Sequence, residues 1–216
     1  MTRNRLILLS SKTAPMESDM NLIDQVHKFR LMLPTVRGWI EYILEENKDQ
    51  AVPVITLAFP QIEKTFPPDF LRTAKVVVVT GKVPFPPLSL MGLNEFSWIE
   101  HMPIAGITYM DTFFVSCLQR KSESLHFHEL VHVAQWERLG VDNFLLAYGI
   151  GLMQDGYQHS PLEKMAYSLQ EAFDRGGLHT DVMEVIQRKS DVIWNGIASM
   201  LSPSNSLKAG HNKESS

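Results

Sequence analysis

The spacing of hydrophobic residues near the start of the chain predicts a pair of helices. Apolar side chains recur at the intervals of a single helix face, at Leu22, Val26, Phe29 and Leu33. Proline interrupts the helical hydrogen-bond ladder, so Pro34 is expected to end a first helix over 19–33. Thr35 can then cap a second helix that continues to about Asn47. We expect this pair to be part of the core scaffold rather than a segment that covers a cleft.

Three apolar runs rich in β-branched residues predict the strands of a small sheet. The first two, 53–59 and 74–80, are bounded by proline and glycine. The third, 104–116, leads toward the helix that carries the candidate chemistry. Strands mixed irregularly with helices indicate an α+β fold, in which a small mixed sheet packs on helices.

Two helices are predicted in the middle of the chain. One spans 122–139, because serines suited to an N-cap precede an apolar run that stops before Gly140. The next stretch, 144–153, carries no charge. It is well short of the roughly 20 residues that cross a bilayer, so we expect a buried helix or a cleft wall there.

Two more helices are predicted toward the end of the chain. Ser160 and Pro161 form a favourable helix start, and the helix is expected to reach about Arg175. A final helix is expected over 179–201 from its apolar spacing. His179 and Asp181 near its start could form an N-terminal cap cluster.

The helix over 122–139 carries the sequence His128-Glu129-Leu130-Val131-His132. Two histidines four residues apart lie on one helix face, about 6 Å apart along the axis. Neutral imidazoles so placed bind one Zn²⁺ at roughly 2.0–2.1 Å. Glu129 can reach a water on that metal without being a ligand, which is the arrangement of a metal-assisted hydrolase. Burying these three side chains unpaired would be unfavourable, which argues against a purely structural role.

A catalytic zinc usually has three protein ligands and one open position, so a third ligand is required. Glu163, in the first turn of the helix that begins at Pro161, is the leading candidate. His159 and Asp155, in the preceding segment, are the alternatives. Tyr167 lies one turn after Glu163 on the same face, from where it could donate a hydrogen bond at the site.

Three other residues with suitable chemistry are given ordinary roles. Glu171 is two turns from the start of its helix and is expected to be a solvated or interhelical charge. His126 points to a different helix face from His128. Cys117 ends an apolar strand and is interpreted as a core residue.

The chain resembles a known group of enzymes, the gluzincin zinc metallopeptidases. Among them it is closest to small bacterial domains that pair an H-E-L-x-H-x-x-Q helix with a P-x-E-x-x-A helix. The matching residues are His128-Glu129-Leu130-Val131-His132-Val133-Ala134-Gln135 and Pro161-Leu162-Glu163-Lys164-Met165-Ala166-Tyr167. The run 105–116 resembles the strand before the motif helix. The resemblance covers about a third of the chain, roughly 104–175.

The resemblance implies a zincin-like fold in which His128, His132 and Glu163 bind zinc and Glu129 is the acid/base. Many gluzincins have an acidic residue four positions after the ligand glutamate, where it orients a zinc histidine. Here that position is Tyr167, so the orienting group differs. A cysteine ligand of the peptide deformylase type is disfavoured, because that family's cysteine lies several tens of residues before its histidines.

The composition fits an ordinary globular protein. Of the 216 residues 44% are hydrophobic and 20% charged, which suits one domain, placed at 19–201 with its core at 104–175. The ends, 1–18 and 202–216, are expected to be disordered. A net charge of −4 gives no electrostatic case for nucleic acid binding. A single cysteine and the lack of a recognisable signal or membrane-spanning segment favour a cytoplasmic protein.

These observations predict a zinc-dependent metalloendopeptidase that acts on peptides or proteins. Glu129 would take a proton from the zinc-bound water and later give it to the leaving amine. A second donor to the developing oxyanion could be Tyr157, Tyr167 or Tyr109. An exposed edge of the third strand could hold a substrate peptide by β-augmentation. The alternatives are a zinc-binding regulatory or interaction domain, a latent peptidase, and a structural protein with a fortuitous motif.

Overall fold

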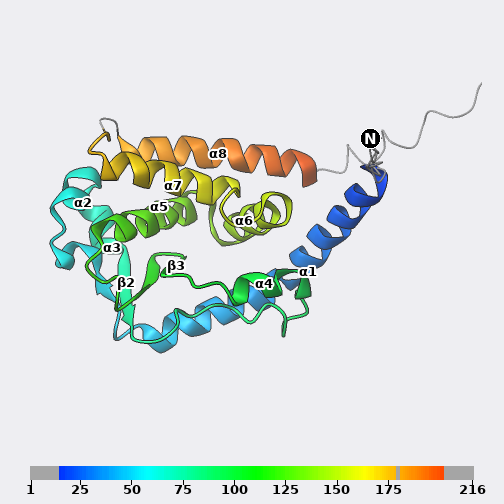
Figure 1. Ribbon diagram of the computed structural model, residues 1–216, viewed down its shortest axis with the longest axis horizontal. Helices are drawn as coiled ribbons and strands as arrows, with labels where there is room; N and C mark the ends of the chain where they lie inside the picture. Colours follow the sequence, from blue (N-terminus) through cyan, green and yellow to red (C-terminus); the bar gives the residue numbers. More distant parts are fainter. Residues whose placement is uncertain (1–14, 179–180, 202–216) are drawn as a thin grey trace, which may run out of the picture.

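A small sheet lies within the fold, and the long helix α1 (Pro15–Asn47) runs along one side of the molecule (Figure 1). The computed structural model describes residues 15–178 and 181–201. In this part of the chain, helices predominate and four strands form one mixed sheet, so the expected α+β class is confirmed. The ends that we expected to be disordered lie outside the described residues, apart from 15–18, which belong to α1.

The strands follow the order β1-β2-β4-β3 across the sheet. Their bounds are Val52–Pro53 for β1, Lys75–Val79 for β2, Gly106–Tyr109 for β3 and Thr112–Ser116 for β4. The central pair, β2 and β4, is parallel, and both outer pairs are antiparallel. The predicted strand over 74–80 is thus confirmed as β2, and β3 is the terminal strand on the side of the motif helix.

Two of the three strand predictions need correction. The run 53–59 is mostly not a strand, because β1 is followed at once by the 3-10 helix η1, Val54–Leu57. Thr56 donates a 2.7 Å hydrogen bond to the carbonyl of Pro53, a local bond that competes with strand pairing. The run 104–116 is a hairpin of β3 and β4 rather than one strand. Its turn at Met110 (φ 55°) contains no glycine or proline to signal it.

The predicted break at Pro34 is also wrong, because α1 continues through this proline. A proline inside a helix removes one backbone hydrogen bond and costs about 3 kcal/mol or more. The side chains of Leu33, Val36 and Ile40 around it are buried in the core. Burial of each contributes roughly 1.5–3 kcal/mol, so packing offsets the cost of the proline.

Short helices occupy the two long connections of the sheet. Helices α2 (Pro60–Thr65) and α3 (Pro68–Thr73) lie between β1 and β2. The 3-10 helix η2 (Asn94–Phe96) and helix α4 (Ser97–Glu100) lie between β2 and β3. This second connection places apolar side chains in the core, among them Val83, Leu88, Phe96 and Ile99.

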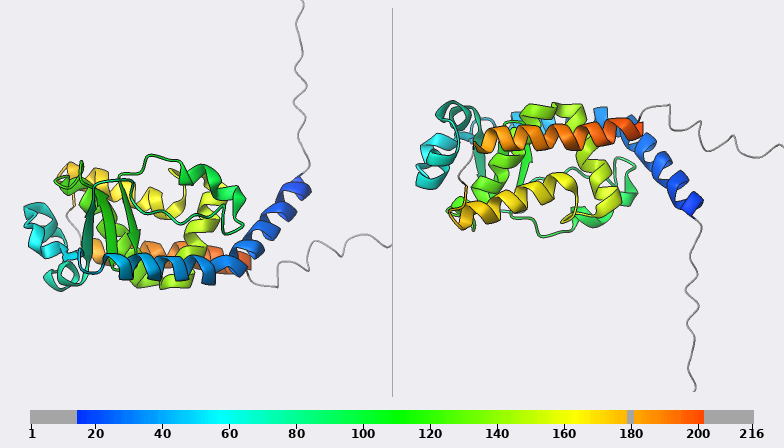
Figure 2. Two further views of the ribbon diagram at one scale, coloured as in Figure 1. Left: turned by 90° about the horizontal axis from the view of Figure 1, so that it is seen from below. Right: turned by 90° about the horizontal axis from the view of Figure 1, so that it is seen from above.

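Four helices follow the sheet, as the sequence predicts: α5 (Glu123–Leu139), α6 (Val141–Asp155), α7 (Pro161–Asp174) and α8 (Val182–Leu201). The Ser122 hydroxyl caps α5 by accepting a 3.2 Å hydrogen bond from the backbone of Leu125. Gly140, at φ 73°, ends α5 and precedes α6. Helix α5 is central, since it packs against β3, α7 and α8 (Figure 2). No helix among the described residues is long and apolar enough to cross a membrane.

Candidate metal centre

Helices α5 and α7 bring three potential metal ligands together. His128 and His132 come from α5, and Glu163 comes from the first turn of α7. The Nε2 atoms of the histidines are 3.1 Å apart, and they lie 3.4 and 3.5 Å from the two carboxylate oxygens of Glu163. The three side chains are buried, and their candidate ligand atoms all lie within 4.8 Å of one another. Two nitrogens and one oxygen form a donor set that suits zinc.

The side chain of Gln135 fixes which nitrogen of His132 faces this centre. The Gln135 amide donates a 3.1 Å hydrogen bond to the carbonyl of Leu162, which can only accept. The Gln135 carbonyl oxygen therefore lies toward His132, 2.8 Å from its Nδ1. Nδ1 must donate to this oxygen, so Nε2 of neutral His132 carries a free lone pair.

A second chain of hydrogen bonds fixes which nitrogen of His128 faces the centre. The Ser124 hydroxyl donates to the Asp174 carboxylate at 2.9 Å, so its oxygen accepts from the Gln170 amide, also at 2.9 Å. This leaves the Gln170 carbonyl oxygen 3.0 Å from His128 Nδ1. Sequence reasoning missed both glutamines as orienting groups. Their spacing in the sequence is the signal that could have found them. Gln135 follows His132 by three residues and Gln170 follows Glu163 by seven, so each glutamine lies on the same helix face as a candidate ligand.

The geometry of the three ligands fits a cation. Two neutral imidazoles with their Nε2 lone pairs 3.1 Å apart repel each other unless a proton or a metal lies between them. The second carboxylate oxygen of Glu163, Oε2, is buried and has no hydrogen-bond donor. A buried acceptor without a partner is unfavourable, and a bound metal would satisfy it.

The electrostatics of the three side chains agree with binding of a cation. Burial lowers the pKa of His132, but the Glu163 carboxylate more than offsets this and holds the pKa at about 9. Burial opposes ionisation of Glu163, yet His132 and His128 keep its pKa well below the ordinary value. The carboxylate of Glu163 thus favours a positive charge at the imidazoles. A metal ion would supply that charge, and it binds the neutral form of the imidazole.

Glu129 lies beside the ligands but is held by β3. Its carboxylate accepts a 2.6 Å hydrogen bond from the Thr108 hydroxyl. A Cβ placed on Gly106 would approach the other carboxylate oxygen to 2.3 Å, so only glycine leaves room for it. Burial raises the pKa of the Glu129 carboxyl, although His128 and His132 act in the opposite direction.

The hydrogen-bond donor to the Glu163 carboxylate is Tyr148, from α6. Its hydroxyl donates to Glu163 Oε1 at 2.6 Å, and burial raises the pKa of the phenol well above its ordinary value. The sequence suggested Tyr167 for such a bond and did not single out Tyr148. The phenol of Tyr148 therefore holds the carboxylate of the candidate ligand in place, as outer partners of metal ligands commonly do.

The three tyrosines suggested as oxyanion donors occupy different positions. Tyr157 lines the pocket at the centre. Tyr167 is partly exposed, and its ring centroid lies 4.6 Å from that of His128, so it covers the imidazole from the outside. The hydroxyl of Tyr109 donates to the carbonyl of Pro84 at 2.9 Å. That bond holds the Tyr109 hydroxyl at the backbone of Pro84 and directs it away from the candidate ligands.

The alternative ligands lie elsewhere. His159 and Asp155 are exposed, and Cys117 is partly buried. None of the three belongs to the ligand group found among the described residues, so Glu163 is the residue that completes it.

The remaining candidates have structural contacts. Glu171 is exposed and forms a 2.7 Å ion pair with Arg175, which confirms its assignment as a solvated charge. His126 is buried and packs on aromatic rings, those of Phe59 and Phe113. Asp181 accepts hydrogen bonds from the backbone amides of Met183 and Glu184 in the first turn of α8, as expected of a cap, whereas His179 lies outside the described residues.

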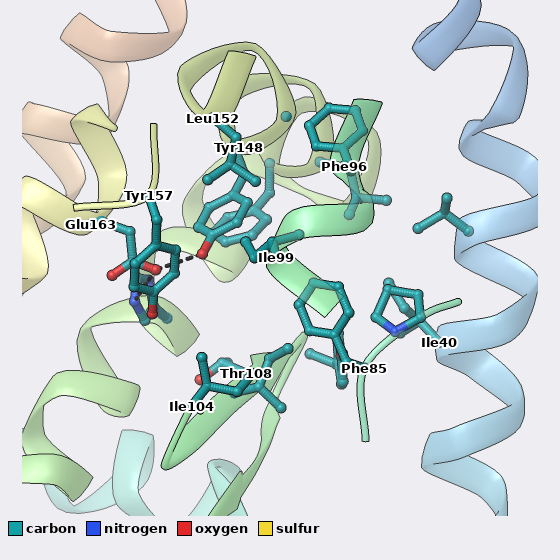
Figure 3. A pocket seen from close by; sticks show the side chains of 18 of the residues that line it. Ile40, Phe85, Phe96, Ile99, Ile104, Thr108, Tyr148, Leu152, Tyr157 and Glu163 are labelled. Carbon is teal, nitrogen blue, oxygen red and sulfur yellow. Dashed lines mark hydrogen bonds and ion pairs between the residues drawn. The ribbon is translucent and has the colours of Figure 1, made fainter. Parts of the chain in front are cut away.

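A pocket extends from the metal centre toward α1 (Figure 3). Its volume is about 100 Å³, and β3, α6, α1 and the connection between β2 and β3 supply its walls. The figure places Tyr148, Tyr157 and Glu163 at one end and Phe85, Phe96 and Ile40 toward α1. The pocket therefore has a polar end at the candidate ligands and an apolar end.

Comparison of the chain with family models, with curated proteins and with solved structures found no match.

Proposed function

We propose that the protein is a zinc-dependent hydrolase of zincin-like fold that cleaves peptide bonds as an endopeptidase. The observation that carries the proposal is the convergence of His128, His132 and Glu163 in a buried site, with Glu129 beside them but outside the ligand group. Structural zinc sites generally use four protein ligands, whereas three ligands with an adjacent free carboxylate are typical of hydrolytic sites.

The ligands would hold the metal through the Nε2 atoms of His128 and His132 and the carboxylate of Glu163. Zinc, when bound, would lower the pKa of a coordinated water from 15.7 to about 7 and polarise the substrate carbonyl. Glu129 would accept the proton of the attacking water and deliver it to the leaving amine. Its raised pKa brings its proton affinity closer to that required near neutral pH.

Two groups of the chain would assist Glu129. Thr108 holds one carboxylate oxygen of Glu129 and so keeps the other oxygen directed for proton transfer. Tyr157 is the best placed of the suggested tyrosines to donate a hydrogen bond to the developing oxyanion. It lines the pocket that contains Glu129, whereas Tyr109 already donates to Pro84 and Tyr167 does not line the pocket.

The position of β3 supports a peptide substrate. It is the terminal strand of the sheet among the described residues, and all four of its residues line the pocket at the candidate metal centre. The carbonyl of Ala105 accepts from Ser116 of β4, so the backbone groups of the next residue, Gly106, face the open edge. A peptide that pairs with this edge would pass Glu129, which lies against Gly106.

Replacing Glu129 by glutamine tests the proposal. We expect Glu129→Gln to retain zinc, measured by elemental analysis, and to lose turnover of a quenched fluorogenic peptide library by at least about 100-fold. Glu171→Gln, an exposed change on α7, is the matched control and should retain both. Full activity of Glu129→Gln would refute its role as general base. A zinc-loaded wild-type protein that cleaves no library peptide would favour the regulatory-domain alternative instead.

A further inference from the structure

We propose that this site selects substrates with one large apolar side chain, of the size of leucine, methionine or phenylalanine, next to the bond that is cleaved. That side chain would occupy the pocket between the metal centre and α1. The inference rests on the proposed function, because it names the substrate class of the same site.

The first support is that the apolar end of the pocket offers no free hydrogen-bond partner to a polar substrate side chain. Among the residues that line it, the carboxylates and imidazoles are those of Glu129, Glu163 and the two histidines. The polar side chains that line the pocket away from the metal centre are already engaged. Tyr109 donates to the carbonyl of Pro84, and the indole of Trp136 donates to the carbonyl of Thr108 at 3.2 Å. A charged or amide side chain placed there would lose its hydration without compensation.

The second support is size. The pocket has a volume of about 100 Å³. An engineered apolar cavity of roughly 150 Å³ is large enough to bind benzene and excludes water. A volume of this order accommodates a single branched aliphatic or aromatic side chain rather than a long acyl chain.

The third support is that the wall of the pocket formed by α1 is held rigidly against α6. Its far wall comes from α1 and from the connection before β3, including Ile40, Phe85 and Phe96 (Figure 3). Helix α1 is held close to α6 because Gly149 has no side chain; a Cβ there would lie 2.4 Å from the ring of Phe29. Both residues line the pocket, so this contact sets its width. A rigid wall allows selection by size and apolarity.

A series of hydroxamic acids tests the inference without a known substrate. These compounds bind zinc through their hydroxamate, and acetohydroxamic acid is compared with 4-methylpentanohydroxamic and 3-phenylpropanohydroxamic acids. Affinity for the zinc-loaded full chain is measured by isothermal titration calorimetry. We expect the two larger compounds to bind at least about 10-fold more tightly than acetohydroxamic acid. A 6-aminohexanohydroxamic acid, which carries an ammonium group, should gain nothing.

Two variants change the pocket in opposite directions. Ile104→Trp should fill it and abolish the preference for the larger compounds, whereas Phe85→Ala should widen it and extend the preference to a naphthyl compound. Val192→Trp, an exposed change on α8, is the control and should keep the wild-type affinity ratio. An affinity ratio near one in zinc-loaded wild-type protein would overturn the inference while leaving the hydrolase proposal standing. A protein that holds no zinc would overturn both.

Discussion

The two histidines of the candidate metal centre are each held by a glutamine side chain. Gln135 and Gln170 accept from the Nδ1 atoms, and their own amide groups are fixed by the carbonyl of Leu162 and by Ser124. A neutral amide sets the imidazole tautomer without adding a negative charge. Among the described residues, the carboxylates that line the pocket at the centre are those of Glu163 and Glu129, and these two supply its negative charge.

Loss of the outer partner of His128 should weaken zinc binding. We expect Gln170→Leu, which keeps the side-chain volume, to reduce zinc affinity by about 10–100-fold because the imidazole is no longer fixed in one tautomer and orientation. The measurement is competition with a chromophoric chelator. Ser168→Ala, at an exposed position of α7, is the control and should bind zinc as the wild type does. Equal affinities of Gln170→Leu and the wild type would show that the glutamine is dispensable.

A methyl group on Gly106 should impair catalysis rather than metal binding. In Gly106→Ala the new Cβ would meet the Glu129 carboxylate, which would have to leave its hydrogen bond with Thr108. We expect at least about a 100-fold loss of peptide turnover, since general-base catalysis contributes roughly 10²–10⁴-fold. Zinc content should stay at the wild-type level. Gly81→Ala, where a Cβ meets nothing, is the control; loss of zinc from Gly106→Ala would contradict this prediction.

At the scale of elements, the close approach of α1 and α6 decides the width of the pocket. The ring of Phe29 lies over Gly149, and the buried face of α1 continues through Val36 and Ile40. This face has enough apolar contact to keep α1 helical through Pro34. The N-terminal helix is thus part of the scaffold, as expected, and it also forms a wall of the pocket.

Two glycine-to-alanine changes distinguish the effect of packing on the free energy of unfolding from the effect of helix propensity. Alanine favours a helix over glycine by about 1 kcal/mol, so Gly38→Ala, with open space around it in α1, should raise the free energy of unfolding by about 0.5–1 kcal/mol. Gly149→Ala should instead lower it by about 1–3 kcal/mol, because the Cβ would overlap the Phe29 ring. Urea unfolding followed by circular dichroism measures both. Similar effects of the two changes would show that α1 does not pack closely on α6.

At the scale of the whole molecule, the candidate metal centre joins α5 and α7. His128 and His132 belong to one helix and Glu163 to the other, so a bound cation would cross-link two helices that already pack together. A ligand that binds the folded state alone stabilises it by mass action.

Removal of the metal should therefore destabilise the protein. At a free zinc concentration of 100 times Kd, the stabilisation is about 2.7 kcal/mol. We expect a chelator to lower the melting temperature of the wild type, measured by differential scanning fluorimetry. Glu163→Ala, which lacks one ligand, is the control and should respond much less. An identical response of the two proteins would argue against Glu163 as a ligand.

The sequence by itself determined the motif helix and the helices after it. The spacing of His128 and His132 places both on one face through helix geometry alone, and Ser122, Gly140 and Pro161 are local start and stop signals. Local signals failed where packing outweighs them, as at Pro34, which lies inside a continuous helix. The sequence also indicated an α+β fold, because that class follows from the mixture of short apolar strands and helices.

Only the tertiary structure decided which distant side chains meet. It selected Glu163 over His159 and Asp155, and it supplied Tyr148 and Gln170 as partners that the sequence did not reveal. The hairpin and the pocket wall from α1 were settled in the same way. The physical reason is that contacts within a helix follow from its period, whereas contacts between elements depend on how their apolar faces pack.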